Sequence, residues 1–499
     1  MDKKHAQTII IIGAGIAGLS TGIYAQLNGY HSKIFELHSQ PGGLMTAWRR
    51  KGYTIDGCIH WLSGSKPGSQ FYPMWEDIGL IQDRTMFDPE VFMRIESKDG
   101  QVFNLYTDIY KVEKHLLEIS PEDGKAVKDV CSIIRKLSKY NPLPGDDFLT
   151  RLRNFLSMAA IMPLFIKWGQ KTMKDLGTQF KNPFLRRAFS DLWFPEMSSV
   201  GFLITMGWLS SGMAGYPLGG SLPMALAVEK HFLNLGGKIR YNTRVRKILI
   251  ENNKAVGVVL EDGSEERADI IISAADGHAT LFDMLEGKYL PQEFQQMYET
   301  FPIFQPLILI GLGVNRKFDE LPGLTSGLIL ELPHPIAIAG KDRDRLEVMI
   351  YNFDPSLAPN GKTAITVMIE SNYDYWKNLA EDRERYDAEK EEIALAVIRQ
   401  LEMRFPGIGN QVEVADVATP LTFERYTGNW QGSFEGWLPT PKVVTKTVPK
   451  ILAGLDNFYM VGQWVQPGGG LPSGVMTAQQ VVKSICKKDG KKFSRANQS

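Results

Sequence analysis

Residues 9–44, IIIIGAGIAGLSTGIYAQLNGYHSKIFELHSQPGGL, decide how this sequence is interpreted. The β-branched run at 8–12 predicts a buried strand, and residues 32–36 predict a second one. Between them, a glycine-rich turn leads into a predicted amphipathic helix that ends near Gly29. Strand, turn, helix and strand form a βαβ unit, so we expect the two strands to be parallel neighbours in an α/β fold.

The spacing of the glycines predicts that this unit binds a ligand. Gly13, Gly15 and Gly18 form a GxGxxG pattern directly after the first strand. Without a Cβ at the first two positions, a diphosphate can approach the amide donors of the helix N-terminus, and Gly18 allows close helix–strand packing. Glu36, at the end of the second strand, is placed to accept hydrogen bonds from an adenosine ribose. These features predict a dinucleotide cofactor, and NAD and FAD fit them equally.

Two further segments separate NAD from FAD. A second glycine pair, Gly42-Gly43, follows Glu36 closely, and a longer cofactor needs such an additional backbone approach near its flavin end. Near the C-terminus, residues 458–461 predict a strand, PGGGLPSG at 467–474 a loop, and a helix is expected to begin near Val475. The positive end of that helix would stabilise a reduced flavin ring. We therefore expect FAD, with turns from both ends of the chain meeting on it.

Composition excludes several other functions. The chain has 499 residues with 56 basic and 56 acidic side chains, so its formal net charge of zero gives no general attraction to nucleic acid. The three cysteines, Cys58, Cys131 and Cys486, are widely spaced and form no CxxC pair. We therefore expect no disulfide framework and no metal site, and a reducing, cytoplasmic compartment.

Two apolar stretches require an interpretation. Residues 155–166 contain Pro163 and are too short to cross a hydrocarbon layer of about 30 Å, which leaves a core helix or an in-plane apolar patch on a membrane surface. Residues 197–228 lack charge but are rich in Gly, Ser and Pro, so we expect them to line an internal cavity. The basic tail 487–499 is expected to be disordered, and it is either simply solvated or attracted to lipid headgroups.

The remaining pattern predicts a second domain. Helices are expected from about 108 to 181 and over 221–235, short strands from 238 to 273, and a charged, solvated surface helix over 382–405. Four strands of a separate sheet are predicted at 306–314, 327–332, 346–353 and 364–371. The fold class is therefore α/β, with a Rossmann-type FAD-binding domain (1–70, 218–285 and 415–499) and a substrate domain of mixed sheet plus helices (71–217 and 286–414).

Six segments spread over the whole chain resemble the flavin-dependent phytoene desaturase, carotenoid isomerase and retinol saturase family. They are IIGAGIAGLSTGIYAQLNGY (11–30), PGGLMTAW (41–48), YTIDGCIHWL (53–62), YPLGGSLPMALAVEKHFLNLGGKI (216–239), VGVVLEDGSEERADIIISAAD (256–276) and MVGQWVQPGGGLPSGVMTAQQ (460–480). The N-terminal segment is shared with monoamine oxidases and other flavoproteins, and the C-terminal one is more specific. The resemblance implies the cofactor FAD and transfer of hydride between the flavin and an allylic or polyene carbon.

The resemblance also implies a set of cofactor-binding residues. They are Gly13, Ala14, Gly15 and Gly18 at the diphosphate, Glu36 at the ribose, Gly42, Gly43 and Leu44 on the far side of the flavin, Val245 at the adenine, and Gly462, Gln463, Gly470, Leu471 and Val475 around the ribityl chain and pyrimidine ring. Two residues depart from the family pattern. Many relatives have arginine at the position of Leu44, which places this chain toward the saturases and isomerases, and many have an acidic residue at the position of Gln463.

The substrate side leaves alternatives open. His60 follows the glycine pair closely, so it is either a proton donor or acceptor near the flavin or a hydrogen-bonded structural histidine. Cys58 is interpreted as a packing residue rather than a covalent flavin attachment. The expected enzyme desaturates, saturates or isomerises a polyene or isoprenoid lipid. The alternatives are an amine-oxidase-like flavoenzyme and a non-catalytic prenyl-binding escort protein. The sequence leaves the oligomeric state and the electron acceptor open.

Overall fold

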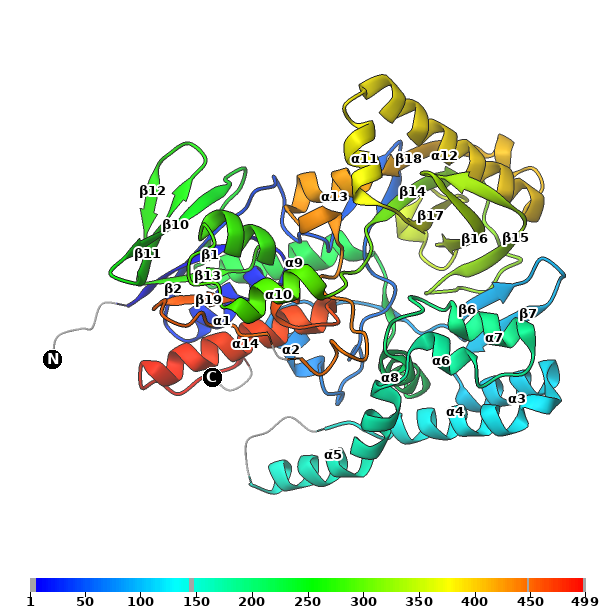
Figure 1. The fold of residues 1–499 in the computed structure, drawn as a ribbon, viewed down its shortest axis with the longest axis horizontal. Helices are drawn as coiled ribbons and strands as arrows, with labels where there is room; N and C mark the ends of the chain where they lie inside the picture. Colours follow the sequence, from blue (N-terminus) through cyan, green and yellow to red (C-terminus); the bar gives the residue numbers. More distant parts are fainter. Residues whose placement is uncertain (1–5, 143–147, 447, 497–499) are drawn as a thin grey trace.

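A five-stranded parallel sheet joins segments from both ends of the chain. The computed structural model describes residues 6–142, 148–446 and 448–496 (Figure 1). The strands run in the order β19-β13-β1-β2-β9, and every neighbouring pair is parallel. Their bounds are β1 (Thr8–Ile12), β2 (His31–Phe35), β9 (Lys238–Arg240), β13 (Ile270–Ser273) and β19 (Phe458–Met460). The predicted βαβ unit and its parallel strands are therefore confirmed.

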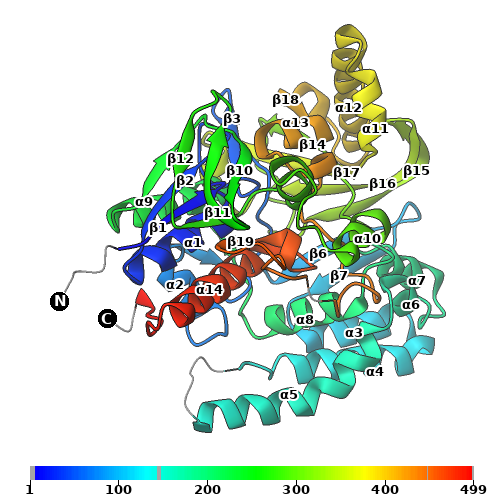
Figure 2. The ribbon, with the colours of Figure 1, turned by 60° about the vertical axis from the view of Figure 1, so that its left-hand side comes forward.

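The two faces of this sheet are covered differently (Figures 1 and 2). On one face, Ile10 and Ile12 share a core with the antiparallel strands of residues 245–260. On the other face, Ile9 and Ile11 share a core with helices. These helices include α1 (Ile16–Leu27), α9 (Ser221–Asn234) and α14 (Gly470–Lys488). The start of α1 packs against the start of α14, where a Cβ at Gly474 would lie 2.9 Å from Cγ2 of Ile16. Helix α14 begins at Gly470, earlier than the predicted start near Val475, because the tight turn at Gly468 and Gly469 precedes it directly.

Three smaller β units accompany the parallel sheet. A three-stranded antiparallel sheet follows α9, and a hairpin follows the first βαβ unit. The units are β10 (Val245–Glu251), β11 (Lys254–Leu260) and β12 (Glu265–Arg267); β3 (Ala47–Arg50) and β4 (Tyr53–Asp56); and the pair β5 (Met86–Phe87) and β8 (Tyr216–Pro217). The hairpin reaches the second sheet, since the indole N–H of Trp48 donates to Asp416 at 2.6 Å.

The second large sheet is mixed and has seven strands in the order β18-β14-β17-β16-β15-β6-β7. All neighbouring pairs are antiparallel except β15 with β6. The bounds are β6 (Val91–Glu96), β7 (Val102–Tyr106), β14 (Leu307–Val314), β15 (Leu328–Ile338), β16 (Lys341–Ile350), β17 (Thr363–Glu370) and β18 (Val412–Ala418). The four predicted strands are present, and three strands that the sequence analysis missed complete the sheet. The domain boundaries stay a prediction.

Helices surround the mixed sheet, as predicted for residues 108–181. Their bounds are α3 (Ile109–Ile119), α4 (Gly124–Leu137), α5 (Phe148–Gly169), α6 (Met173–Gly177), α7 (Pro183–Ser190), α8 (Ser199–Ser210), α11 (Tyr373–Leu379), α12 (Arg383–Arg404) and α13 (Pro420–Thr427). Two further helices, α2 (Tyr72–Asp77) and α10 (Gln292–Thr300), pack instead in the cores of the parallel-sheet domain. Helix α12 was expected to be a solvated surface helix, but Val397 and Leu401 are fully buried, so one of its faces packs in the core of the mixed sheet.

Helix α5 lies at the edge of the molecule in both views (Figures 1 and 2). Large apolar side chains are exposed along it, including Phe148, Phe155 and Leu156 with exposed fractions of 77%, 69% and 59%. Within the described residues it is the one helix whose length and composition are sufficient to cross a membrane. The expectation that this stretch is too short to cross was wrong, because the helix extends beyond 155–166 at both ends. Only 6% of its most apolar 18-residue window is buried, so the core-helix alternative for 155–166 is wrong.

The C-terminal tail is ordered where the structure describes it. The backbone N–H of Ser494 donates to the side chain of Asn28 at 2.7 Å, and Arg495 pairs with the buried Asp77 at 2.7 Å. The ring of Phe493 also packs on Tyr24 of α1. The predicted disorder of this tail is therefore wrong up to residue 496, because apolar and charged contacts to α1 and α2 hold it, while 497–499 lie outside the described residues.

Candidate functional site

The two glycine turns meet on one cavity of about 1270 Å³. It extends from the carboxyl ends of the parallel strands to the mixed sheet and to α8. Most of the residues expected at the site line this cavity. They are Gly13, Gly15, Glu36, Gly42, Gly43, Leu44, Cys58, His60, Val245, Gly462, Gln463, Gly470 and Leu471. Segments separated by most of the chain therefore face a common space, as expected for one long cofactor.

The N-terminal turn consists of two glycine pairs packed on each other. The backbone N–H of Gly42 donates to the carbonyl of Ala14 at 2.9 Å, which connects the second pair to the first. A Cβ at Gly43 would lie 3.4 Å from Cα of Gly15, so the backbones are in van der Waals contact. At Gly42 a Cβ would overlap the carbonyl oxygen of Met45 and would lie 2.9 Å from Cβ of Ala225, so this position has no room for a side chain. The glycines are thus required by backbone packing and, at the same time, leave the wall of the cavity open.

Three of the expected residues do not line the cavity. Gly18 faces inward, and a Cβ there would overlap the carbonyl oxygen of Gly13, so its role is helix–strand packing. Ala14 is fully buried behind the turn. Val475 is fully buried in the core between α14 and the sheet, because α14 starts earlier than the sequence indicates and places this residue beyond its first turn. A direct contact of these three residues with the cofactor stays a prediction.

Glu36 lies where the sequence places it, at the end of β2 on the cavity wall. One carboxylate oxygen accepts a hydrogen bond from the backbone N–H of Ala14 at 2.5 Å, and the other accepts one from His38 at 2.7 Å. Burial raises the pKa of Glu36, and these two backbone bonds oppose the rise. The carboxylate therefore stabilises the glycine turn itself, and it also borders the space in which a ribose would lie.

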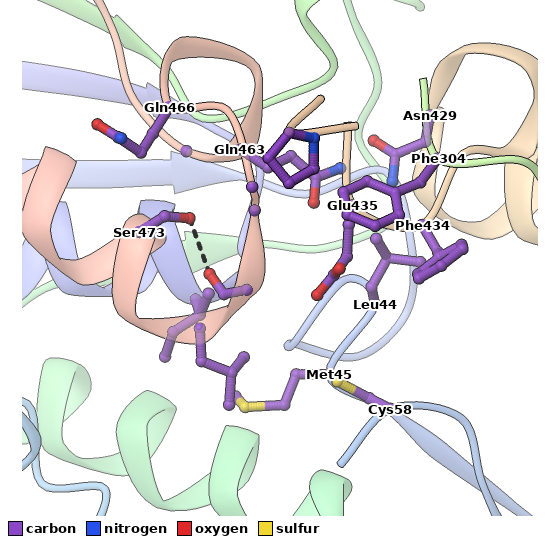
Figure 3. A pocket seen from close by; sticks show the side chains of 18 of the residues that line it. Leu44, Met45, Cys58, Phe304, Asn429, Phe434, Glu435, Gln463, Gln466 and Ser473 are labelled. Atoms are coloured by element: carbon purple, nitrogen blue, oxygen red, sulfur yellow. Dashed lines mark hydrogen bonds between the residues drawn. The ribbon is translucent and has the colours of Figure 1, made fainter. Parts of the chain in front are cut away.

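The C-terminal turn is held by short polar contacts. The backbone N–H of Gly462 donates to the hydroxyl of Thr477 at 2.9 Å, and the hydroxyl of Ser473 donates to the carbonyl of Gly470 at 2.8 Å (Figure 3). The first turn of α14, from Gly470, therefore faces the cavity with its free backbone N–H groups. Such a helix end favours negative charge on a bound group.

These features fit FAD. The wall runs from Val245 past Gly13 to Leu44 and then to the C-terminal turn, so an elongated molecule can contact all of them at once. A Cβ at Gly15 would meet only one atom, at 3.9 Å, which shows that this glycine opens onto free space. The backbone amides and the acidic residue at the end of β2 suit a diphosphate and a ribose. When bound, FAD supplies acceptance and donation of hydride.

The other half of the cavity has one wall rich in aromatic rings, while charged side chains of β16 and β17, such as Arg343 and Glu370, also line it. Trp61 stacks on Trp193 with ring centroids 5.7 Å apart, and Phe304 lies edge-on to Phe194 at 5.3 Å. Helix α8 contributes apolar side chains to the same wall, so the expectation that 197–228 lines a cavity is confirmed for its first part. Sequence reasoning missed several of these side chains, namely Trp193, Phe194, Phe304, Phe434 and, from α5, Met162 and Phe165. Their sequence spacing gives no common signal, because they come from separate loops and helices.

His60 lines the cavity but is not suited to exchange a proton near neutral pH. Its ring contacts Trp61 with a centroid separation of 6.2 Å. Burial lowers the pKa of His60 to about 4, because the apolar surroundings disfavour the charged ring. The imidazole is therefore neutral at pH 7. Its surroundings do not support the expected role as a proton donor at that pH.

Cys58 and its neighbours are fixed by the buried carboxylate of Asp56. That carboxylate accepts hydrogen bonds from the backbone N–H and the hydroxyl of Ser221, both at 2.6 Å, and from the backbone N–H groups of Cys58 and Ile59. Burial and this nearby carboxylate raise the pKa of the Cys58 thiol, so the thiol is not ionised at neutral pH. A neutral thiol is a weak nucleophile, which agrees with the interpretation of Cys58 as a packing residue.

Several carboxyl groups on the cavity wall were not found from the sequence, and two of them have a pKa that is raised to near neutrality. Asp276 follows β13 and accepts hydrogen bonds from the backbone N–H groups of Ala279 and Trp430 at 2.8 and 2.9 Å. Glu435 lies after α13 and points into the cavity near Leu44 (Figure 3). Burial raises the pKa of each carboxyl to about 7. The AAD sequence at 274–276 could have indicated Asp276, whereas Glu435 has no local sequence signal.

A parallel sheet with glycine turns at the carboxyl ends of its strands, facing an apolar cavity, defines a dinucleotide-dependent flavoprotein. The chain belongs to the family of flavin-containing amine oxidoreductases, which it matches over residues 16–486. Its cofactor is FAD, as the sequence predicts.

Curated relatives and solved structures agree with this assignment. The chain is 32% identical to the chloroplastic prolycopene isomerase of Arabidopsis thaliana, covering 95% of this chain and 82% of that protein. It is 25% identical to a 4,4'-diapophytoene desaturase of Methylomonas sp., covering 99% and 97%. The cyclohexylamine oxidase of Brevibacterium oxydans has the same fold, with a TM-score of 0.62, 15% identity and coverage of 98% and 100%. The resemblance to carotenoid desaturases and isomerases is thus confirmed.

Proposed function

We propose that this protein is an FAD-dependent oxidoreductase that acts on carbon–carbon double bonds of a polyene or isoprenoid lipid, by desaturation, saturation or cis–trans isomerisation. The proposal rests on one observation. The cavity that the two glycine turns line is also lined, farther from these turns, by aromatic and aliphatic side chains. The names of the relatives, which include isomerases and desaturases of carotenoids, support the same substrate class.

The physical chemistry of the cavity suits such a substrate. A polyene has no polar groups to recognise, so binding depends on apolar area, which the rings of Trp61, Trp193 and Phe304 provide. Planar conjugated chains also pack well against aromatic faces. A cavity that excludes water protects the transfer of hydride from side reactions. The role of the protein is therefore mainly to orient the chain against the flavin and to keep the site dry.

We also propose that α5 lies in the surface of a membrane and that the substrate enters beside it. The helix exposes apolar residues such as Phe155 and Leu156, while Met162 and Phe165 from its second half line the cavity. One helix thus joins the exposed apolar surface to the site. A water-insoluble lipid can then pass from the membrane without crossing water.

Three free cysteines in the described residues support a reducing, cytoplasmic location for the protein.

The direct test is a turnover assay with polyenes presented in liposomes. The purified protein is loaded with FAD and offered cis- and trans-carotenoids and retinoids, first with oxidised and then with anaerobically reduced flavin. We expect a change in the double bonds of a polyene, detected by chromatography. Net reduction of the flavin identifies a desaturase, net oxidation a saturase, and a change of isomer without either identifies an isomerase.

Other results would contradict the proposal. Amine-dependent formation of hydrogen peroxide, with no effect of polyenes on the flavin, would favour an amine oxidase. A protein that stays colourless after addition of FAD but retains a prenylated peptide would favour an escort protein. A matched control is the variant G18V. Its side chain would disrupt the diphosphate turn without touching the apolar wall, so it should lose both the yellow colour and the turnover.

A further inference from the structure

A carboxyl group stands where the two glycine turns approach each other. Glu435 lines the cavity together with Leu44 of the N-terminal turn (Figure 3). On the other side it packs on the C-terminal turn, since a Cβ at Gly469 would lie 2.9 Å from Cβ of Glu435. A Cβ at Gly470 would lie 3.8 Å from its Oε1 atom. The carboxylate therefore borders the region in which the flavin and the substrate would meet.

This carboxyl group has no polar partner among the residues that the structure describes. No hydrogen bond or ion pair is formed with it there, whereas Glu36 and Asp276 each accept two backbone N–H groups. Its neighbours in Figure 3 include the apolar Leu44 and Phe434. Burying a carboxylate without a partner costs free energy. The unpartnered carboxyl of Glu435 therefore differs from those of Glu36 and Asp276, whose hydrogen bonds fix the backbone.

The groups that face Glu435 are uncharged at pH 7, so none of them fixes its carboxyl in one protonation state. From the segment after β4, the Cys58 thiol interacts with it electrostatically and is neutral at pH 7. From the C-terminal turn, Gly469 and Gly470 carry no charge, and Gln463 carries an uncharged amide. Burial raises the pKa of Glu435 to about 7 because no cation compensates the lost hydration. Both protonation states are then accessible at neutral pH, which suits a group that gives and takes protons.

We propose that Glu435 donates or accepts the proton that accompanies each change of a double bond in the substrate. The proposal rests on the proposed function and adds to it the residue that handles the proton. His60, which lines the same cavity, is not suited to this role because it is neutral at pH 7.

The proton and electron balance is complete in each direction. In desaturation, one carbon loses a hydride to oxidised FAD, the neighbouring C–H bond breaks, its electron pair forms the new double bond, and the proton goes to the Glu435 carboxylate. Saturation is the reverse, with the hydride from reduced FAD and the proton from the Glu435 carboxyl. In isomerisation, the carboxyl adds its proton to a terminal carbon of the conjugated chain, the single bond so formed rotates, and the same carboxylate takes the proton back.

The test compares E435Q with the wild type and with E299Q, the same substitution at an exposed glutamate of α10. All three proteins are loaded with FAD, and polyene turnover is followed in D2O. We expect the wild type and E299Q to incorporate solvent deuterium into the polyene, or to release substrate protons to solvent. We expect E435Q to keep its FAD, to lose roughly 10²-fold or more in rate, and to lose the pH dependence near pH 7.

A second measurement does not depend on turnover. Ionisation of a carboxyl beside the flavin shifts the absorption spectrum of the flavin, so the wild type should show a spectral transition near pH 7. The part of this transition that comes from Glu435 should be absent in E435Q, while any part that comes from Asp276 should remain. Wild-type turnover, deuterium exchange and pH profile in E435Q would overturn the role of Glu435. Failure of E435Q to hold FAD would also overturn it, because the residue would then be structural. A wild type that shows the transition but acts on no polyene would instead overturn the proposed function.

Discussion

The backbone N–H of Ala14 donates a hydrogen bond to the carboxylate of Glu36 at 2.5 Å, which ties the glycine turn after β1 to the end of β2. A second backbone donor, His38, approaches the other carboxylate oxygen at 2.7 Å. The acidic residue that the sequence assigns to the cofactor thus also shapes the turn on which the cofactor would lie. Substitutions at this position are therefore expected to act through backbone geometry as well as through a lost contact.

The variant E36Q should bind FAD more weakly. A glutamine offers one acceptor oxygen and directs an NH2 group at the other backbone donor, so a buried N–H loses its partner at a cost of about 1–3 kcal/mol. This corresponds to a loss of roughly 5- to 150-fold in affinity, measurable by titration of the apoprotein with FAD. The exposed Glu265 of β12 provides the control, because E265Q should bind FAD like the wild type. Equal affinity of E36Q and the wild type would contradict the role of the carboxylate.

The variant G18A should lose most of its FAD. Even a methyl group at this position overlaps the carbonyl oxygen of Gly13, and backbone cannot yield as a flexible side chain can. The turn must shift, so the yellow colour and the thermal stability of the holoprotein should both fall. The control is G124A at the start of α4, where a Cβ would lie at an ordinary 3.6 Å from Leu117. G124A should retain the FAD content of the wild type. Full occupancy of G18A by FAD would show that the packing of residue 18 against Gly13 is not tight.

The stability of E435Q relative to the wild type should increase with pH. The folded protein holds the Glu435 proton up to about pH 7, while the unfolded chain releases it near pH 4.5. The wild type therefore has its full stability below pH 4.5 and loses part of it as the pH rises through 7, whereas glutamine does not ionise. The difference in unfolding free energy should reach roughly 1–3 kcal/mol by pH 9. Urea unfolding between pH 5 and 9 measures it, and a difference that is independent of pH would be the contrary result.

Removal of the apolar surface of α5 should release the protein from membranes. In the triple variant F148S/F155S/L156S, three of the most exposed apolar side chains of this helix become polar. Each such side chain contributes about 1.5–3 kcal/mol when it leaves water, so the triple variant should no longer float with liposomes. The double variant L395S/M403S removes apolar side chains that are similarly exposed on α12, and it should float like the wild type. Flotation of the triple variant would exclude α5 as the membrane contact.

The local features of the fold were predictable, and the distant contacts were not. The GxGxxG turn, the parallel strands and the meeting of both glycine turns follow from short segments whose backbone requirements are specific, such as Gly13 and Gly43. The sheet strands β6, β7 and β18 were missed, because their pairing depends on the neighbours that fold around them. Glu435 was missed for the same reason. Nothing near it in sequence indicates that Leu44 and Gly469 surround it in the fold.

The tail and α5 show how tertiary contacts override composition. Residues 487–496 read as a solvated basic tail, yet Phe493 and Arg495 have partners on α1 and α2 that only the folded chain presents. Conversely, the apolar stretch at 155–166 suggested a core helix as one alternative, and the structure leaves it exposed. Sequence patterns therefore identified which segments were unusual, but burial could be assigned only once the neighbouring elements were in place.

The position of β19 at the edge of the parallel sheet has a consequence for biosynthesis. Gly13 and Gly462 line the same cavity, but Gly462 is translated long after Gly13 because most of the described chain lies between them. A nascent chain that carries only the first βαβ unit has the N-terminal glycine turns of the site but lacks the C-terminal turn, so we expect it not to retain FAD. Stable capture of the cofactor must therefore wait until β19 and the turn after it have been translated, and termination before β19 would yield a protein without colour, however well its remaining parts fold.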